Sequence, residues 1–207
     1  PLYSSAASDV YKRQVFLSSP LYMFTDKSGQ LGTLYAVEHG NDKYTEYLGS
    51  NHGVFIKNQN RLQFLENSNG QVWNLNRIDD EIICGHNNGT FQIKNKIFKP
   101  ISDLSGGVRF IITEEENTYL QANYTGLSEF KKTNDSWEID SYDKVKFRIN
   151  EVAIDENGNY WVNSPHNGVS HYKFKNNSLQ LERFYDENEV KHIFQLKNVV
   201  YLTSKNK

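Results

Sequence analysis

The sequence is poor in the residues on which several protein classes depend. It contains a single cysteine, Cys84, which excludes an internal disulfide, and only four prolines. No apolar run approaches the roughly 20 residues that a membrane-spanning helix needs. Lys and Arg form no cluster and the net charge is −2, so we expect no nucleic-acid binding by this segment. No apolar pattern with a helical period extends beyond a turn or two, which leaves an all-β fold.

Aromatic residues and turn-forming residues are instead abundant. The 207 residues include 13 Tyr and 12 Phe, which favour pleated, half-buried strands. One sequence motif recurs four times: a strand-like run, a polar turn that ends in Gly, and a second strand-like run. The turn glycines are Gly53, Gly89, Gly126 and Gly168, at steps of 36, 37 and 42 residues. A β-only repeat with a period near forty residues predicts the blades of a propeller.

Aligning the four glycines predicts four strands in each repeat. The first strands begin at residues 34, 72, 108, 149 and 190, and the second strands at 45, 81, 118, 159 and 199. The third and fourth strands follow the turn glycine, which gives each repeat the four antiparallel strands of a blade. The fold predicted is therefore an all-β, partial β-propeller of about four and a half blades with open ends. The predicted blades are 31–68, 69–104, 105–146, 147–186 and a partial fifth at 187–207.

The start of the chain differs from this pattern. Residues 1–14, PLYSSAASDVYKRQ, join no repeat and resemble a translated sequencing-adapter tail, so we exclude them from the fold. Residues 15–30 are expected to be a strand or linker from a preceding blade. Because an open propeller leaves strand edges unpaired, the intact domain is expected to contain more blades than this fragment.

The best-formed repeat, DENGNYWVNSPHNGV at 155–169, carries a family resemblance. It resembles the short repeat of two-component-regulator propellers through Asp155, Gly158, Tyr160, Trp161, Val162, Ser164, Gly168 and Val169. The other repeats match this pattern only in part. The richness in Asn, Lys, Tyr and Ile resembles proteins of the Bacteroidota.

This resemblance implies a role and a location. Such propellers are periplasmic sensor segments of inner-membrane-anchored regulators, and are not enzymes. They precede a triple-tyrosine β-sandwich and then a histidine kinase or helix-turn-helix output, which would be partners within the full-length chain. The resemblance therefore predicts a sensory, ligand-binding or signal-relay segment.

The repeated turns supply the candidate binding residues. In a propeller, these turns lie on the rim where each blade begins, beside the axial funnel. Amide, imidazole and aromatic groups there suit a small polar ligand, for which a glycan is one candidate. Arg109 stands near the predicted channel and could bind a carboxylate or sulfate. The candidate ligand-binding residues are Asn51, His52, His86, Asn87, Arg109, Asn123, Tyr124, His166 and Asn167.

The same turn residues also have a purely structural explanation, and two other functions remain open. Asn stabilises tight turns without any ligand, so each turn residue has a structural explanation. The histidines have no partner at metal-ligand spacing, so no metal is expected, and no motif suggests a cofactor. A propeller lyase or glycosidase acting on polysaccharide would need a catalytic pair, and His52 or His86 with Tyr124 is the pair we can nominate. A protein–protein scaffold would expose broad aromatic patches on the rim instead.

Overall fold

The structure is a computed structural model that describes residues 26, 28–59, 61–134, 136–142, 144–175, 178–197 and 199–204. The predicted tail at 1–14 lies outside the described residues, as does most of the segment 15–30. Of the chain before Leu31, only Asp26 and residues 28–30 are described, and the Asp26 carboxylate accepts a hydrogen bond from the Ser28 amide. Residues 31–207 form a separate compact unit, and the fold described below is that of this unit.

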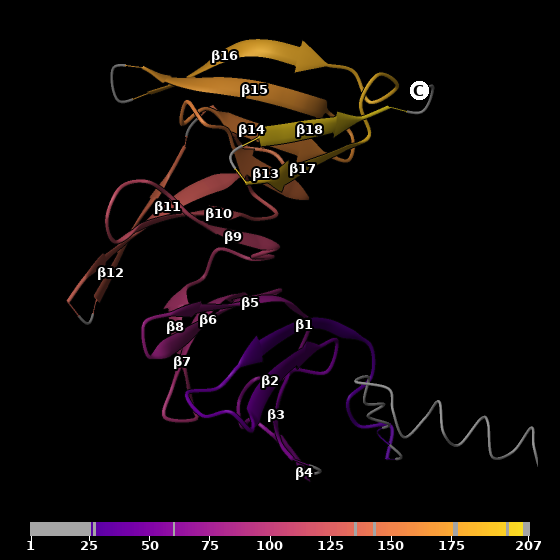
Figure 1. The fold of residues 1–207 in the computed structure, drawn as a ribbon, viewed down its shortest axis with the longest axis vertical. Coiled ribbons are helices and arrows are strands. Elements are labelled where there is room, and N and C mark those ends of the chain that lie inside the picture. The colour runs from indigo at the N-terminus through magenta and orange to yellow at the C-terminus, as the bar shows by residue number, and fades with distance from the viewer. Residues whose placement is uncertain are drawn as a thin grey trace, which may run out of the picture. The chain divides into compact units, whose positions relative to one another are not determined.

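Every regular element in the described part of this unit is a β-strand (Figure 1). The strands form four four-stranded sheets, blades 1 to 4, and one two-stranded sheet, blade 5. Blade 1 contains β1 (Leu34–His39), β2 (Thr45–Ser50), β3 (Val54–Asn58) and β4 (Arg61–Phe64); blade 2 contains β5 (Val72–Ile78), β6 (Glu81–His86), β7 (Gly89–Lys94) and β8 (Ile97–Ser102). Blade 3 contains β9 (Arg109–Ile112), β10 (Thr118–Ala122), β11 (Leu127–Thr133) and β12 (Ser136–Ser141). Blade 4 contains β13 (Glu151–Ile154), β14 (Tyr160–Ser164), β15 (Gly168–Lys175) and β16 (Ser178–Tyr185); blade 5 contains β17 (His192–Leu196) and β18 (Val199–Thr203).

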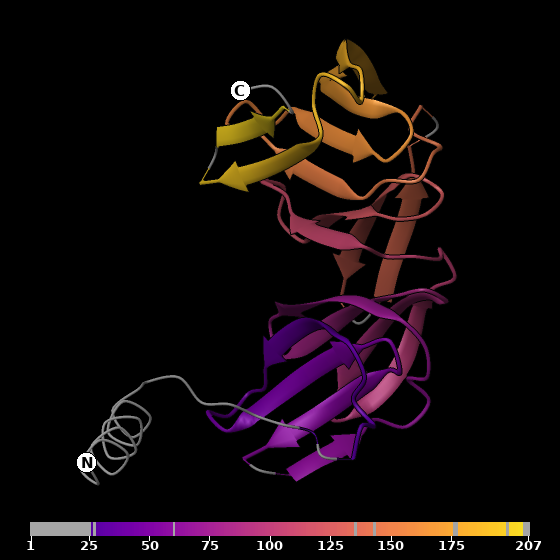
Figure 2. The same ribbon diagram turned by 90° about the vertical axis from the view of Figure 1, so that its right-hand side faces the viewer.

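Consecutive strands pair antiparallel within each blade, and no crossover occurs in these sheets. The successive sheets follow one another along the chain, as Figure 2 shows from the side. This arrangement confirms the predicted all-β, partial propeller with open-ended blades. None of the described residues belongs to a helix long and apolar enough to cross a membrane.

Three of the five first strands begin later than the sequence predicts. In two of these three, the amide of the apolar residue at the predicted start donates to a carbonyl outside the pairing with the second strand. The Ile149 amide donates to the Asn123 carbonyl at 3.2 Å, and the Val190 amide donates to the Asp186 carbonyl at 3.0 Å. The side chains of both residues are still buried. The apolar pattern therefore marks a buried position correctly, whereas the strand begins one or two residues further on, at Arg109, Glu151 and His192.

The second strands of blades 2 and 3 are buried at every position, so both faces of each strand are covered. In β6, Ile82 and Cys84 pack toward blade 1, and Ile83 packs toward blade 3. Alternate side chains of a strand point to opposite faces of the sheet, so a strand between two neighbouring blades needs apolar residues at every position. The core of the unit is consequently a series of layers, each shared by two blades.

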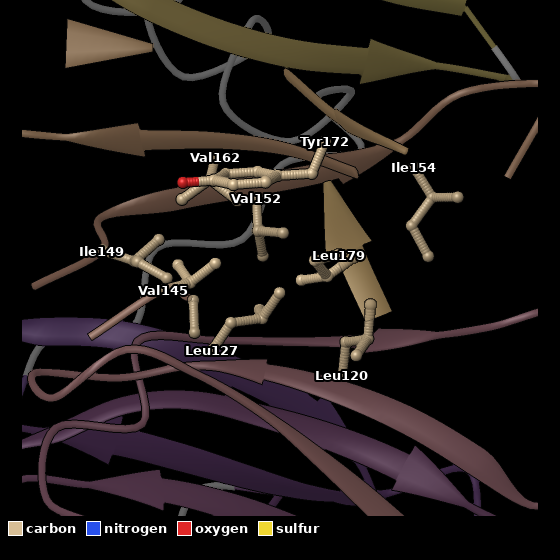
Figure 3. Close-up of a cluster of buried hydrophobic side chains, with 10 residues drawn as sticks. Leu120, Leu127, Val145, Ile149, Val152, Ile154, Val162, Tyr172 and Leu179 are labelled. Atoms are coloured by element: carbon tan, nitrogen blue, oxygen red, sulfur yellow. The ribbon is translucent and has the colours of Figure 1, made fainter. Parts of the chain in front are cut away.

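The layer between blades 3 and 4 is the largest of these clusters. Leu120 and Leu127 from blade 3 meet Val152, Val162 and other residues from blade 4 (Figure 3). Val145 and Ile149, in the segment that joins the two blades, complete it. Removing a fully buried leucine such as Leu120 from a layer of this kind costs about 2–5 kcal/mol. The joining segment is thereby fixed against both blades, which matters because it carries part of the site described below.

Candidate binding rim

One end of the blades is built from two kinds of segment, which together we call the rim. The turns between second and third strands supply residues 51–53, 87–89, 124–126 and 166–168. The lead-ins, which precede the first strands, supply residues 31–33, 69–71, 105–108, 145–150 and 186–191. Each turn glycine lies so close to the backbone at or shortly after the end of its blade's fourth strand that a Cβ would clash with a carbonyl oxygen there. A Cβ on Gly126, whose φ is +150°, would lie 1.9 Å from the Val145 carbonyl oxygen.

Backbone hydrogen bonds connect the turns of blades 1 to 3 to their own lead-ins and to the next ones. In blade 2, the Asn87 amide donates to the Gln71 carbonyl at 2.9 Å, and the His86 carbonyl accepts from the Gly106 amide at 3.0 Å. In blade 3, the Tyr124 amide donates to the Ser105 carbonyl at 3.1 Å, and Asn123 accepts from Ile149. The rim is therefore a preformed, hydrogen-bonded edge that places side chains from neighbouring blades beside one another.

Two of the predicted ligand-binding residues are buried and stabilise the rim. Asn123 is fully buried, and its Oδ1 accepts hydrogen bonds from the Thr125 and Gly126 amides at 2.9 and 2.8 Å. Its Nδ2 donates to Ser128 Oγ at 3.1 Å. Every polar atom of this side chain is thus used in closing its own turn. Asn123 shapes the rim and has no side-chain group left for a ligand.

His86 has a similar structural position. Its side chain is 1% exposed, and its Nδ1 accepts a hydrogen bond from the Asn88 amide at 3.1 Å. Burial lowers the pKa of the imidazole, so the ring is neutral at physiological pH. Its Nε2 and the Oδ1 of Asn87 are buried without a hydrogen-bond partner among the described residues. A group that reached these two atoms would therefore gain hydrogen bonds that the protein leaves unmade.

The other turn residues lie at or near the surface. Asn51 is partly exposed, and its Oδ1 accepts from the Thr33 amide at 2.7 Å, whereas His52 is exposed. His166 and Asn167 are both exposed at the turn of blade 4. Asn167 reaches back to Ser164 Oγ at 3.4 Å. These residues are accessible, but the structure does not bring His52 and His166 into one group, because they belong to blades 1 and 4.

A continuous strip of side chains crosses the rim, and sequence reasoning found only one of its members. The Tyr35 and Trp73 rings meet edge to face with centroids 5.5 Å apart, and Trp73 meets Tyr124 in the same way at 6.2 Å. The Arg148 guanidinium then lies over the Tyr124 ring, 4.7 Å from its centroid. We call these four residues the aromatic strip. It extends from blade 1 to the lead-in of blade 4, and Tyr35 is 48% exposed.

The strip could have been found in part from the aligned repeats. Tyr35, Trp73 and Arg109 occupy the same second place in their first strands. That shared place indicates residues at the same level of neighbouring blades. Arg148 has no such signal, because it precedes the apolar residue of its lead-in and acquires its role only by lying on Tyr124.

Arg109 is exposed, and the strand register gives its direction. It lies opposite Ala122, and residues directly opposite in an antiparallel pair share a face of the sheet. Ala122 packs in the layer between blades 3 and 4. Arg109 therefore faces the junction that Arg148 also borders, since the neighbouring Ile149 is bonded to Asn123. Neither arginine forms a salt bridge with any described residue.

A pocket of about 280 Å³ opens at the rim between blades 4 and 5. Its lining includes Asn163, Ser164, Glu187 and Lys191. Glu151 also lines it, and both oxygens of its carboxylate are engaged: Oε1 by His192 Nδ1 at 2.9 Å, and Oε2 by the Ile193 amide at 2.9 Å and Asn163 Nδ2 at 2.8 Å. Glu151 thereby ties blade 4 to blade 5, and the pocket is a polar recess beside this tie.

Reactive groups are scarce in the described residues. No three His, Cys, Asp or Glu side chains there are arranged to bind a metal ion. Cys84 is fully buried, and burial raises the pKa of its thiol far above the usual range, so it is not a thiolate nucleophile. The Tyr124 ring packs on Trp73, Arg148 and the Gly106 backbone. The His86 Nδ1 accepts a hydrogen bond from its own turn, so it is not available as a catalytic base for Tyr124.

Among solved structures, the fold is shared with extracellular domains of two-component systems. No family model and no curated protein matches the sequence. The extracellular domain of BT4673 from B. thetaiotaomicron, assigned to the two-component systems, superimposes over 82% of this chain with a TM-score of 0.62 and 17% identity. That of BT3049, a hybrid two-component system of the same organism, covers 88% with a TM-score of 0.67 and 10% identity. This chain shares their fold.

The likeness has two limits. The chain spans only 25% of the BT4673 structure and 30% of the BT3049 structure. The N-terminal domain of Nup159 also superimposes, over 83% of this chain with a TM-score of 0.51 and 11% identity. The fold resemblance that the 155–169 repeat predicted is confirmed, whereas the role of the rim has to be argued from its own chemistry.

Proposed function

We propose that this chain is a segment of the periplasmic sensor propeller of an envelope-spanning bacterial regulator. Its rim binds a small polar ligand of the sugar type, and binding is relayed to the domains that follow in the full-length chain. The fold shared with the extracellular domains of BT4673 and BT3049 supports the sensory part. The aromatic strip is the observation that carries the ligand-binding part.

The strip has the chemistry of a sugar-binding surface. Three aromatic rings from three blades form a contiguous apolar surface, with Tyr35 and Tyr124 offering phenolic hydroxyls beside it. Amphipathic rings of this kind provide stacking area together with directional hydrogen bonds. The rim backbone that carries Tyr124 and Arg148 is fixed by hydrogen bonds on both sides, so little ordering is needed on binding.

Binding of a panel of oligosaccharides to the full chain, measured by calorimetry, tests this proposal. We expect Tyr35→Ala and Tyr124→Ala each to weaken binding by about tenfold, because the first removes the exposed ring of the strip and the second removes the ring that holds Arg148. Tyr44→Ala is the matched control, since Tyr44 is 58% exposed and lies in the loop before β2, outside the rim. Equal affinity of all three variants, or no binding of any saccharide, would contradict the proposal.

A polysaccharide-cleaving propeller is the alternative that the same samples address. The rim pocket contains two carboxylates, Glu151 and Glu187. An enzyme would release new reducing ends or unsaturated products from polysaccharide, whereas a sensor leaves the bound saccharide intact. Product release that is lost in Glu151→Gln would replace the proposed function with a catalytic one. The regulator context is tested separately by the coding sequence on either side, where a membrane helix and an output module are expected.

A further inference from the structure

We infer that the ligand of the rim carries an anionic group, a carboxylate or a sulfate, which Arg109 and Arg148 bind at the junction of blades 3 and 4. This inference rests on the proposed function and specifies the charge of the ligand. Both arginines are exposed, border one junction and lack a salt-bridge partner among the described residues.

Several described cations elsewhere in the unit form ion pairs with described carboxylates, which neither of these two arginines does. The described cations elsewhere include Lys57 with Glu46, Lys94 and Lys132 with Glu81, and Lys173 with Glu182. Arg77 is bonded to the Asn41 amide oxygen and the His39 carbonyl. The two arginines at the junction of blades 3 and 4 are thus cations whose hydrogen-bonding capacity is left open on the exposed rim.

The positions of Arg148 and Arg109 around Tyr124 indicate how an anionic sugar would be oriented. The Arg148 guanidinium is held over the Tyr124 ring, which orients its plane and leaves its N–H groups free at the edges of the stack. Arg109 points toward the same junction from β9. A sugar ring lying against the strip beside Tyr124 would present a carboxylate or sulfate at the end where the guanidinium groups lie. Guanidinium binds such oxyanions through paired hydrogen bonds.

Two carboxylates of blades 3 and 4, Glu129 and Glu151, are bound by groups other than the two arginines. Glu129 accepts a hydrogen bond from the Tyr142 hydroxyl at 2.7 Å, and Glu151 is engaged by blade 5. Asn123 and Asn150 contribute neutral side chains there, and the segment that joins blades 3 and 4 also contains Lys144 and Lys146. The local field therefore favours a negative ligand, even though the chain as a whole has a net charge of −2.

The experiment compares three probes of similar size on the full chain: a uronic-acid trisaccharide, its neutral methyl ester, and a sulfated disaccharide. We expect at least one acidic probe to bind at least tenfold more tightly than the ester, and the difference to shrink as salt rises. Arg148→Gln and Arg109→Gln should each weaken binding of the acidic probe about tenfold and weaken binding of the ester much less. Preference for the uronate or for the sulfate identifies which anion is recognised.

Arg183→Gln is the matched control. Arg183 also stacks on a tyrosine, with its guanidinium 4.7 Å from the Tyr185 ring centroid, but it lies in the outer strand β16. Unfolding by urea should be the same for all three arginine variants, which separates binding from folding. Ester binding equal to acid binding overturns this inference and leaves the proposed function intact. Absence of binding by every probe contradicts both.

Discussion

The junction of blades 2 and 3 and the junction of blades 4 and 5 arise from the same repeat but are closed in different ways. Four residues before the turn glycine, blade 2 has Gly85 and blade 4 has Ser164. Gly85 lies against the backbone of Gly107, where a Cβ would come within 1.9 Å of the carbonyl oxygen. Ser164 instead lines the 280 Å³ pocket. One junction is closed by backbone contact, and the other leaves a polar recess.

The polar ties across the two junctions differ in the same sense. At the junction of blades 2 and 3, Thr90 and Gln121 are buried and hydrogen-bonded at 2.8 Å, and buried Glu81 pairs with Lys132 at 3.2 Å. At the junction of blades 4 and 5, half-buried Glu151 bonds to His192, which is exposed. A repeat can therefore keep its strands and turns while a few side chains decide whether a junction is dry and tight or wet and accessible.

Exchanging the two residue types between the junctions should produce the largest difference in the free energy of unfolding. Gly85→Ser forces a side chain into the Gly107 carbonyl, and we expect a loss of more than about 3 kcal/mol in the free energy of unfolding. Ser164→Gly only enlarges an existing pocket and should cost less than about 1 kcal/mol. Urea titration of both variants measures the difference, and similar losses would contradict it.

Removing the carboxylate of Glu81 or of Glu151 should change the free energy of unfolding by different but smaller amounts. Glu81→Gln removes the buried partner of the Lys132 ammonium, which is 11% exposed and then pairs only with the exposed Asp79. We expect this change to cost about 3 kcal/mol. Glu151→Gln removes hydrogen bonds from a half-buried group and should cost about 1 kcal/mol. Equal costs in the same urea titration would show that burial does not separate these junctions.

Acid should lower the stability of blade 4 at its junction with blade 5. Burial alone would raise the pKa of Asp155, but hydrogen bonds from Trp161 Nε1 and Asn159 outweigh it and lower the pKa below its usual value. A carboxylate whose pKa is lower in the folded state contributes stability above its unfolded pKa, near 3.9, and loses it as the pH falls through the folded pKa.

Asp155→Asn removes this dependence. Between pH 5 and pH 3, wild type should lose about 1 kcal/mol more stability than the variant. Trp161 packs against the layer between blades 4 and 5, so its fluorescence follows the change. Parallel pH profiles for wild type and Asp155→Asn would refute the assignment of this carboxylate as a stabilising group.

The smallest effects are expected at the turn of blade 4. His166→Ala and Asn167→Ala change exposed side chains, and each should alter stability by less than about 0.5 kcal/mol. Neither should affect saccharide binding, because the aromatic strip ends at the lead-in of blade 4. A clear loss of binding in either variant would move the site toward the pocket at the junction of blades 4 and 5.

The sequence was sufficient for the strands but not for the side-chain environments. A turn glycine with a nearby backbone oxygen, as at Gly126, is demanded by the fold, so the recurring glycines set the register of every blade. Whether a turn asparagine faces a ligand or its own backbone depends on tertiary contacts. Asn123 satisfies its turn and is buried, whereas Asn167 is exposed, although the aligned phrases look alike.

The aromatic strip shows why the site could be predicted only in part. Tyr124 comes from a turn, Trp73 from a first strand and Arg148 from a lead-in, so its members occupy no single column of the repeat. Their contacts depend on how neighbouring blades stack. Arg109 was predicted from its position near the channel, but its direction toward blade 4 follows only from its register with Ala122.

Hydrogen exchange of the full chain, with and without the tightest-binding saccharide, tests the central claim most directly. If the aromatic strip is the binding surface, slowed exchange will appear in peptides that cover residues 123–125 and 146–149. Peptides that cover residues 165–167 and 187–192 will remain unchanged. Slowed exchange confined to the latter peptides, beside the pocket of blades 4 and 5, would contradict the account.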